Sequence, residues 1–445
     1  MATQPIDDHE LTAALDVLRR LQGVATDDPA YLRAEQAVAH FTKTTKKRRR
    51  TLRAAAARSA DRRIDESTLV FQQAAEAAVS ASEGSAGLRS RDRRCYICKA
   101  RYRSVDAHYH LLCPPCALRN RTARQARSNL LGRRAVVTGG RIKIGLETSL
   151  RLLRAGAEVA ITTRFPVDAQ HVYAAQPDAV EWIDRLVIVK ADFLKAVDVA
   201  DLIEMVADRW DHIDILVNNA AQTIRRSPDY YNAVMTGEAR TAPALAATCW
   251  SLNDVSHQPA IVVAGHALQQ FGVELDESGQ PLDRSATNSW KLQLHDVEPS
   301  EWLETYLIGS FVPYLLIRGL RPLMLASPHA DRYVVNVTAM EGAFARQYKG
   351  PGHPHTNAAK ASLNMITRTI AETYATDGVF VTSVDTGWIT DERPHREKER
   401  QRAAGFRPPL DPIDGAARVC HPIEAGVAGQ PMFGVFLKDY EVAPW

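Results

Sequence analysis

The chain has 445 residues, of which 45% are hydrophobic and 24% charged, and its formal net charge is +3 at pH 7. This length exceeds that of one ordinary domain, so two or three folded units are expected, with enough hydrophobic residues to bury a large core. Arg318 and Arg321 interrupt the longest apolar run, so the sequence predicts no membrane-spanning helix. The acidic first residues lack a signal-peptide core, which predicts a cytoplasmic protein.

The small net charge conceals a basic front part and an acidic remainder. Residues 1–130 contain 24 Lys and Arg against 14 Asp and Glu, a net charge of +10, which leaves −7 for residues 131–445. Helical spacing of leucines and alanines around the basic cluster Lys46–Arg50 predicts a basic helical region over residues 1–88, with separate helices before and after the cluster. Such a region is typical of binding to nucleic acid or an acidic protein surface, although a solvated Arg-rich helix explains the same charges.

Two Cys-x-x-Cys pairs follow, Cys95 with Cys98 and Cys113 with Cys116, with fourteen residues between them. Thiolates at this spacing hold one ion from a tight turn, and two such turns complete a tetrahedral four-thiolate zinc site. We therefore expect a structural, treble-clef-like zinc module over residues 89–130. A redox dithiol is the alternative, but one pair would suffice for that chemistry.

The stretch Ala135–Gly145 begins as a short apolar strand and continues into a glycine-containing turn. The residues from Ile144 to Ala155 then have the spacing of an amphipathic helix. Strand, turn and helix in this order form the first unit of a dinucleotide-binding α/β fold, in which backbone N–H groups of the turn meet the pyrophosphate. A second pattern, Asn218–Ala221, follows about 80 residues later, at the end of another apolar strand.

Together these patterns resemble the fingerprints of the short-chain dehydrogenase/reductase family, T-G-x-x-x-G-x-G and N-N-A-G, with Lys143 in place of the middle glycine. The resemblance implies an α/β fold with a Rossmann-type doubly wound parallel sheet over residues 131–445. It also implies oxidation or reduction of a small carbonyl or alcohol substrate with NAD(P). The residues predicted to contact this cofactor are Gly139, Gly140, Arg141, Lys143, Ile144, Gly145, Arg164, Asp192, Phe193, Asn219, Ala220, Lys360 and Gly387.

The end of the second predicted strand of this domain indicates which cofactor is used. NAD-preferring members of the fold place a carboxylate there, whereas this chain has Thr163 and Arg164. Arg164 and Arg141 offer two guanidiniums for a 2′-phosphate, so we predict NADP rather than NAD; two surface arginines are the alternative. The side chain of Lys143 either blocks the pyrophosphate or pairs with it.

The resemblance also locates the catalytic positions, and three of them are substituted, with Tyr306 in place of the family's asparagine. Thr338 and Ala339 align with the two serines of the family pattern, the second of which is catalytic, and Thr356 aligns with the catalytic tyrosine. Lys360 keeps the family's lysine. A threonine hydroxyl is a far weaker acid than a tyrosine phenol, whose pKa is about 10, so it cannot simply replace the phenol.

Two substitutes for the missing proton donor are conceivable from the sequence. Tyr348 could reach the site from a Gly/Pro-rich loop while Thr338 holds the substrate oxygen, or His353 or His355 could act as the acid, because imidazole titrates in the right range. A purely loop-shaping role is the alternative. The predicted catalytic set is Lys360, Thr356, Thr338 and Tyr348.

About 75 residues, from about 222 to 299, separate the Asn-Asn-Ala pattern from the next predicted helix. Loops of this length are uncommon unless they are functional, so this insertion is predicted to form a lid or a partner surface.

Three functions fit these observations. The first is an NADP-dependent oxidoreductase with a modified proton donor, assembled as a homo-oligomer, and analogy of fold favours it. The second is a catalytically inactive NADP(H)-binding regulator or scaffold, which the substituted residues favour. The third is a nucleic-acid-binding front part joined to a redox-sensing α/β domain.

Overall fold

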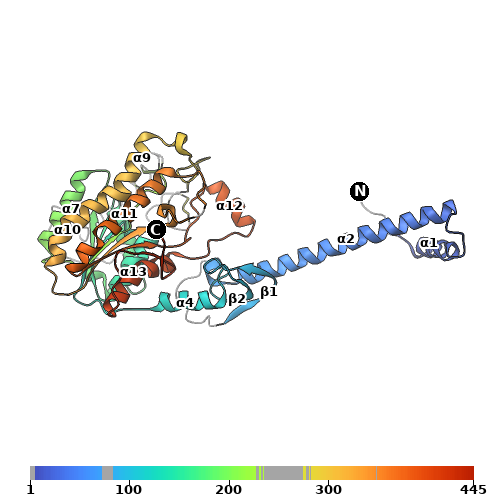
Figure 1. The fold of residues 1–445 in the computed structure, drawn as a ribbon, viewed down its shortest axis with the longest axis horizontal. Helices are drawn as coiled ribbons and strands as arrows, with labels where there is room; N and C mark the ends of the chain where they lie inside the picture. Colours follow the sequence, from blue (N-terminus) through green and yellow to red (C-terminus); the bar gives the residue numbers. More distant parts are fainter. Residues whose placement is uncertain are drawn as a thin grey trace.

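The computed structural model describes residues 6–72, 84–226, 230–231, 234, 274–276, 280, 282–346 and 348–445. These residues form a rounded body and a long helical arm that projects from it (Figure 1). Most of the predicted insertion, including residues 235–273, lies outside the described residues, as does the stretch 73–83 of the predicted basic region.

An eight-stranded sheet lies at the centre of the body, in the order β10-β9-β8-β7-β6-β3-β4-β5. Its strands are β3 (Arg134–Thr138), β4 (Glu158–Thr163), β5 (Leu186–Lys190), β6 (Ile215–Asn218), β7 (Arg332–Thr338), β8 (Val379–Asp385), β9 (Phe436–Lys438) and β10 (Glu441–Ala443). All neighbours run parallel except β9 and β10. The strand order reverses between β3 and β6, which confirms the predicted Rossmann-type doubly wound sheet.

Helices cover both faces of this sheet. The helices of the body are α5 (Lys143–Arg154), α6 (Pro166–Ala174), α7 (Ala196–Arg209), α9 (Pro299–Tyr306), α10 (Val312–Leu325), α11 (Pro354–Thr376), α12 (His395–Ala403) and α13 (Pro412–Val427), with short 3-10 turns at Ala179–Glu181, Ile183–Arg185, Leu294–Asp296 and Met340–Gly342. Successive residues of β3 enter opposite cores: Val137 packs in one cluster with Leu150 of α5, and Val136 in the other with Leu316 of α10. Burial on both faces explains why the strands read as continuous apolar runs.

A continuous helical run of 27 residues, 299–325, joins α9 to α10 through the π-helical turn Leu307–Phe311. By length and composition this run could cross a membrane, whereas the sequence predicted no such helix. In this structure the run packs against the central sheet, because Leu316 and Leu320 lie in the same hydrophobic cluster as Val136 and Leu216.

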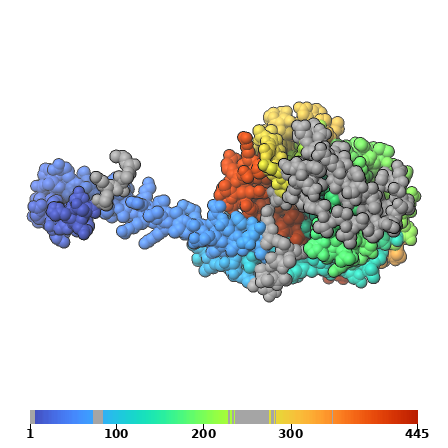
Figure 2. Space-filling view, turned by 180° about the vertical axis from the view of Figure 1, so that it is seen from behind, coloured from blue at the N-terminus to red at the C-terminus, as the bar shows by residue number. Residues whose placement is uncertain are grey.

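The arm consists of α1 (Asp8–Leu21) and α2 (Pro29–Glu66), which stand away from the body (Figure 1 and Figure 2). The prediction of separate helices around the cluster Lys46–Arg50 is wrong, because α2 runs through the cluster as one helix of 38 residues. No glycine or proline interrupts residues 30–66, and alanine, arginine and lysine, which favour helix, fill its middle. The cluster therefore lies along an exposed helix surface.

Two carboxylates hold the C-terminal end of α2 to the body. They face the antiparallel hairpin of β1 (Ser85–Arg94) and β2 (Arg101–Asp106), which comes after the short helix α3 (Leu69–Gln72). Asp65 pairs with Arg93 at 2.9 Å and also with Arg89, while Asp61 accepts a hydrogen bond of 2.6 Å from the backbone N–H of Ser90. The arm is thus anchored at one end, whereas α1 at its other end has no buried residue.

Candidate active site

A pocket of about 880 Å³ opens where the parallel strands β3 to β8 end. Open α/β sheets bind ligands in this crevice, beside the point where the strand order reverses. The predicted cofactor residues that line it are Gly139, Arg141, Lys143, Ile144, Gly145, Arg164, Asp192, Phe193, Asn219, Ala220, Lys360 and Gly387. The structure therefore brings these residues, which span about 250 positions of the sequence, to one cavity.

The glycine turn after β3 is folded too tightly for side chains. A Cβ at Gly145 would lie 2.1 Å from the carbonyl oxygen of Gly139 and 2.5 Å from the side-chain nitrogen of Asn219. Gly140, which does not line the pocket, lies underneath, where a Cβ would be 2.7 Å from Ile161 of β4. The turn can therefore close over the start of α5 only with glycine at these positions.

The Asn-Asn-Ala pattern supports this turn from the neighbouring strand β6. The hydroxyl of Thr138 accepts hydrogen bonds from the backbone N–H groups of Asn219 at 2.9 Å and Ala220 at 3.0 Å. The side-chain amide of Asn219 donates to the carbonyl oxygens of Thr138 at 3.0 Å and Gly139 at 3.2 Å. The two patterns recognised in the sequence thus meet at the point where the strand order reverses.

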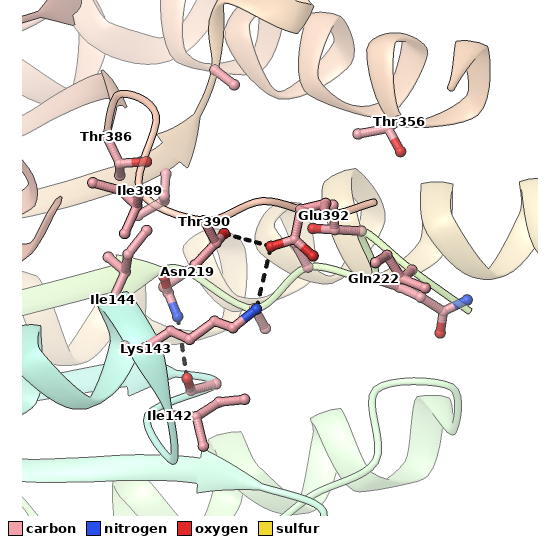
Figure 3. A pocket seen from close by; sticks show the side chains of 18 of the residues that line it. Ile142, Lys143, Ile144, Asn219, Gln222, Thr356, Thr386, Ile389, Thr390 and Glu392 are labelled. Carbon is pink, nitrogen blue, oxygen red and sulfur yellow. Dashed lines mark hydrogen bonds and ion pairs between the residues drawn. The ribbon is translucent and has the colours of Figure 1, made fainter. Parts of the chain in front are cut away.

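Lys143 reaches across the pocket, as Figure 3 shows, and its Nζ lies 3.2 Å from Oε1 of Glu392 in the loop after β8. Its backbone has φ +52°, the left-handed region that glycine adopts most easily. Burial acts to raise the pKa of Glu392. The charge of Lys143 and the hydroxyl of Thr390 outweigh this effect and lower the pKa of Glu392 to about 2. The ammonium is thus held between the glycine turn and the loop after β8.

The two arginines predicted to bind a 2′-phosphate have different surroundings. The guanidinium of Arg141 is buried, pairs with Asp168 and donates to Gln280 at 2.8 Å. In this structure the guanidinium of Arg141, predicted to contact the 2′-phosphate, is therefore bound by Asp168 and Gln280. Arg164, in contrast, lies over the ring of Tyr231 at 4.6 Å, and no ion-paired carboxylate accompanies it among the residues that the structure describes. Of the two arginines predicted to bind the 2′-phosphate, Arg164 is therefore the stronger candidate.

Lys360 of α11 lies at the centre of the predicted catalytic group. Its Nζ donates a hydrogen bond of 2.7 Å to the carbonyl oxygen of Val337 at the end of β7. Burial lowers the pKa of Lys360 to about 8, and the carboxylate of Glu341 opposes this shift only in part. An amine whose pKa lies this close to neutrality exchanges its proton readily under ordinary conditions.

Two threonine hydroxyls, of Thr338 and Thr356, accompany Lys360 in the pocket wall. The Oγ1 atom of Thr338 lies 3.5 Å from the carbonyl oxygen of Lys360. Thr356 is buried, and its hydroxyl has no hydrogen-bond partner within the part of the chain that the structure describes. Ala339, which the sequence predicts at the position of the catalytic serine, also lines the pocket.

None of the proposed substitute donors lines the pocket. Tyr348 is 75% exposed and lies outside the residues that line the cavity, so its predicted approach to the site is wrong for this structure. The ring of His353 stacks on that of Trp290 with centroids 4.0 Å apart, and His355 is buried, with Nε2 3.7 Å from Glu301. His353 thus packs at the N-terminus of α11, and His355 packs α11 against α9.

Sequence reasoning missed several pocket residues. Asp385, at the end of β8, is buried and accepts hydrogen bonds from the backbone N–H groups of Met340 at 2.7 Å and Gly387 at 2.6 Å, and burial raises its pKa. Glu392 was missed because its partner lies 249 positions away. Tyr96 and Lys99, which lie in the turn of the first cysteine pair, also line the pocket. Their positions in the sequence, next to Cys95 and Cys98, did not indicate this.

The four cysteines form a compact cluster at the junction of arm and body. All four Sγ atoms of Cys95, Cys98, Cys113 and Cys116 lie within 4.8 Å of one another. The first pair lies in the turn between β1 and β2, and the second pair opens α4 (Pro114–Gln125), for which Cys113 is the N-cap. Four sulfurs converging from a turn and a helix start match the donor set of a closed zinc site.

This sheet order, the glycine turn and the pocket at the strand ends define an α/β protein of the Rossmann type. Residues 133–237 match the family model described as short chain dehydrogenase. The chain is also 35% identical over 100 residues to the short-chain dehydrogenase/reductase homolog YusS of Bacillus subtilis, a match that covers 21% of this chain and 85% of that protein. The chain therefore belongs to the short-chain dehydrogenase/reductase family.

A longer match extends over most of the chain. The uncharacterized protein R665 of Acanthamoeba polyphaga mimivirus is 33% identical over 351 residues, covering 74% of this chain and 71% of that protein. Among solved structures, Pseudomonas aeruginosa RhlG in complex with NADP is 20% identical, with 69% of this chain and 95% of that chain covered and a TM-score of 0.46. NADPH-bound carbonyl reductase from chicken fatty liver is 17% identical, with 73% and 98% covered and a TM-score of 0.46.

Proposed function

We propose that this chain is an NADP-dependent oxidoreductase of the short-chain dehydrogenase type that acts on a carbonyl or alcohol. The observation that carries the proposal is the convergence, in one pocket, of the glycine turn, Asn219, Arg164 and Lys360. The first two suit a dinucleotide, the arginine suits a 2′-phosphate, and the lysine supplies a group that can exchange a proton.

The residues of the pocket fit a dinucleotide along its length. Asp192 and Phe193, just after β5, would face the adenine, and the guanidinium of Arg164, which lies over the ring of Tyr231, would bind the 2′-phosphate. The backbone N–H groups at the start of α5 and the ammonium of Lys143 would bind the pyrophosphate. When bound, the nicotinamide supplies or takes up the hydride.

In this proposal Lys360 exchanges the proton that the family's tyrosine exchanges elsewhere. Its lowered pKa, about 8, leaves an ammonium that gives up a proton near neutral pH. The hydroxyls of Thr338 and Thr356 would orient the substrate oxygen, because both line the pocket beside Lys360. Neither hydroxyl has to ionise for that role.

We also propose that the four cysteines hold one structural zinc ion. All four ligands would be cysteine sulfurs, so the site would be closed and would offer no place for a reacting water. His108 and His110, which lie in the loop between the two pairs, are buried, and burial lowers the pKa of each to about 4. Neither belongs to the cluster of converging donors within the described residues.

The choice of cofactor is tested by replacing Arg164 with alanine. Removing one charge-assisted phosphate contact costs about 1.5–3 kcal/mol, so the Kd for NADPH should rise roughly 10- to 100-fold while the Kd for NADH stays unchanged. Titration of the nucleotide fluorescence measures both constants. Arg321→Ala, on α10 and paired with Asp377 away from the pocket, is the matched control and should bind as the wild type does. Equal wild-type affinity for the two cofactors, unchanged in Arg164→Ala, would contradict the assignment.

The second candidate is a nucleotide-binding regulator without turnover. Ala339 and Thr356 favour it, because they remove the family's two hydroxyl groups that contact the reacting oxygen. Both candidates are expected to bind NADPH in the nucleotide titration. Only turnover of NADPH with a carbonyl substrate separates them. A panel of aldehydes and ketones, followed by NADPH absorbance, makes that distinction.

A further inference from the structure

The cysteine module and the pocket share a wall. The turn that carries Cys95 and Cys98 also carries Tyr96 and Lys99, and both of these side chains line the pocket. Figure 1 shows β1, β2 and α4 between the arm and the body, beside α13. A change in the conformation of the module would therefore change the wall of the pocket.

One hydrogen bond joins the first cysteine turn to the loop after β8. The hydroxyl oxygen of Tyr96 accepts a bond of 2.9 Å from the backbone N–H of Trp388. The same oxygen lies 3.6 Å from the point that a Cβ of Gly387 would occupy. This loop forms one side of the pocket and contains Glu392, the partner of Lys143. Tyr96 thus holds the loop that faces the glycine turn.

Apolar contacts continue this junction. Cys95 and Cys113 belong to a hydrophobic cluster that also contains Ile389, from the loop after β8, and Ile144, from the glycine turn, packs against it. Both sides of the proposed pyrophosphate site therefore rest on the cysteine module. Loosening the module would move both of them.

The second cysteine pair is fixed to the body by bonds that do not involve the sulfurs. Arg124 of α4 pairs with Asp411 at 2.6 Å, and Asn120 of α4 accepts a hydrogen bond of 2.7 Å from Arg418 of α13. The turn of the first pair contacts the body through the hydroxyl of Tyr96, while the backbone N–H of Tyr96 donates to the carbonyl oxygen of Leu111, within the module, at 2.9 Å. An ion bound by all four sulfurs would clamp the first turn onto α4.

We propose that the metal occupancy of the four cysteines sets the affinity of the pocket for the dinucleotide, with Tyr96 as the positioning residue that transmits the effect. This inference rests on the proposed function, because it concerns binding at that same pocket. Metal holds the first turn on α4, the turn holds Tyr96 against the backbone of Trp388, and the loop after β8 then stays in place to close on the nucleotide. Loss of the metal releases this chain of contacts at its start.

The first test compares two Tyr→Phe variants of the zinc-loaded protein by NADPH fluorescence titration. Tyr96→Phe removes the acceptor of the Trp388 N–H and should raise the Kd about fivefold without changing the zinc content. Tyr102→Phe is the matched control. It removes a hydroxyl of the same module, which donates to the carbonyl oxygen of His110 at 3.0 Å and does not line the pocket. It should leave the Kd as in the wild type, and equal Kd values for Tyr96→Phe and wild type would overturn the proposal.

The second test removes the metal from wild type and from Tyr96→Phe with a chelator and repeats the titration. Stripping should raise the Kd of the wild type at least about tenfold and that of Tyr96→Phe by a clearly smaller factor, because the two changes act through one contact. Equal factors in the two proteins, or no change in either, would overturn the proposal while leaving the proposed function intact. Absence of NADPH binding in every sample, zinc-loaded wild type included, would instead refute the proposed function itself.

Discussion

Replacing Lys360 with methionine is expected to lower the kcat of carbonyl reduction by roughly 10²–10⁴-fold, the usual contribution of a positioned proton donor. Methionine keeps most of the apolar stem but has no titratable group. NADPH absorbance with a panel of aldehydes and ketones measures the rate. A parallel NADPH titration separates lost chemistry from weakened cofactor binding, because the Lys360 side chain lines the same pocket.

The pH dependence gives this prediction a second signature. The pKa of Lys360 is lowered to about 8, so the ammonium form that donates a proton predominates below that pH. Carbonyl reduction should therefore be fastest below about pH 8 and slow down above it, whereas alcohol oxidation, which needs the neutral amine, should become faster through the same range. Thr338→Val, which removes only an orienting hydroxyl, should keep the midpoint. An unchanged kcat and pH profile in Lys360→Met would rule out the assigned role, and a gain of activity in Thr356→Tyr would identify a weakened form of the family's site.

Replacing Cys113 with serine is expected to reduce bound zinc from one ion per chain to nearly none. Cys113 is the N-cap of α4, and its Sγ lies 3.5 Å from that of Cys98. In small metal-dependent modules the ion supplies about 10–16 kcal/mol of apparent binding free energy, so residues 91–128 should also become sensitive to proteases. Metal analysis and limited proteolysis measure the two effects.

Cys420 offers the matched control for this experiment. It is buried in the core beside the sheet and does not belong to the four-sulfur cluster. Cys420→Ala should therefore keep the zinc ion and the protease resistance of residues 91–128. Wild-type protein that contains no zinc, and whose four cysteines react freely with a thiol reagent, would refute the metal site.

The local patterns of the sequence were sufficient to predict the sheet and the glycine turn. Apolar runs such as Arg332–Thr338 became strands because both faces of the sheet are covered. The turn at Gly139 and the pattern at Asn219 were found because each is a short, contiguous signal whose geometry requires particular residues. Such features depend on neighbours along the chain, which a sequence displays directly.

The features that the sequence did not reveal depend on contacts between distant segments. Arg141 was assigned to the cofactor, but Asp168, 27 positions away, holds its guanidinium. Lys143 finds its partner Glu392 only in the folded chain. Tyr348 lies twelve positions before Lys360, yet the loop carries it to the surface. Proximity along the chain gave no information about these three outcomes.

Several expectations from the sequence stay predictions. The basic surface of α2, which includes Lys46–Arg50, is exposed along the arm, and an anionic partner, either nucleic acid or an acidic protein face, is still expected for it. The homo-oligomeric state and the cytoplasmic location also stay predictions. A salt-dependent affinity for DNA or RNA would identify the partner as nucleic acid.

Binding of NADP(H) in the pocket at the strand ends is tested by calorimetric titration of NADPH into wild type and Gly145→Val. A Cβ at Gly145 would lie 2.1 Å from the carbonyl oxygen of Gly139, so valine must open the turn that receives the pyrophosphate. Gly350→Ala, where a Cβ meets nothing within 4 Å, is the control. We expect one NADPH bound per chain in wild type and control, and none in Gly145→Val with its circular dichroism spectrum preserved. Absence of binding in wild type, or undiminished binding in Gly145→Val, would contradict it.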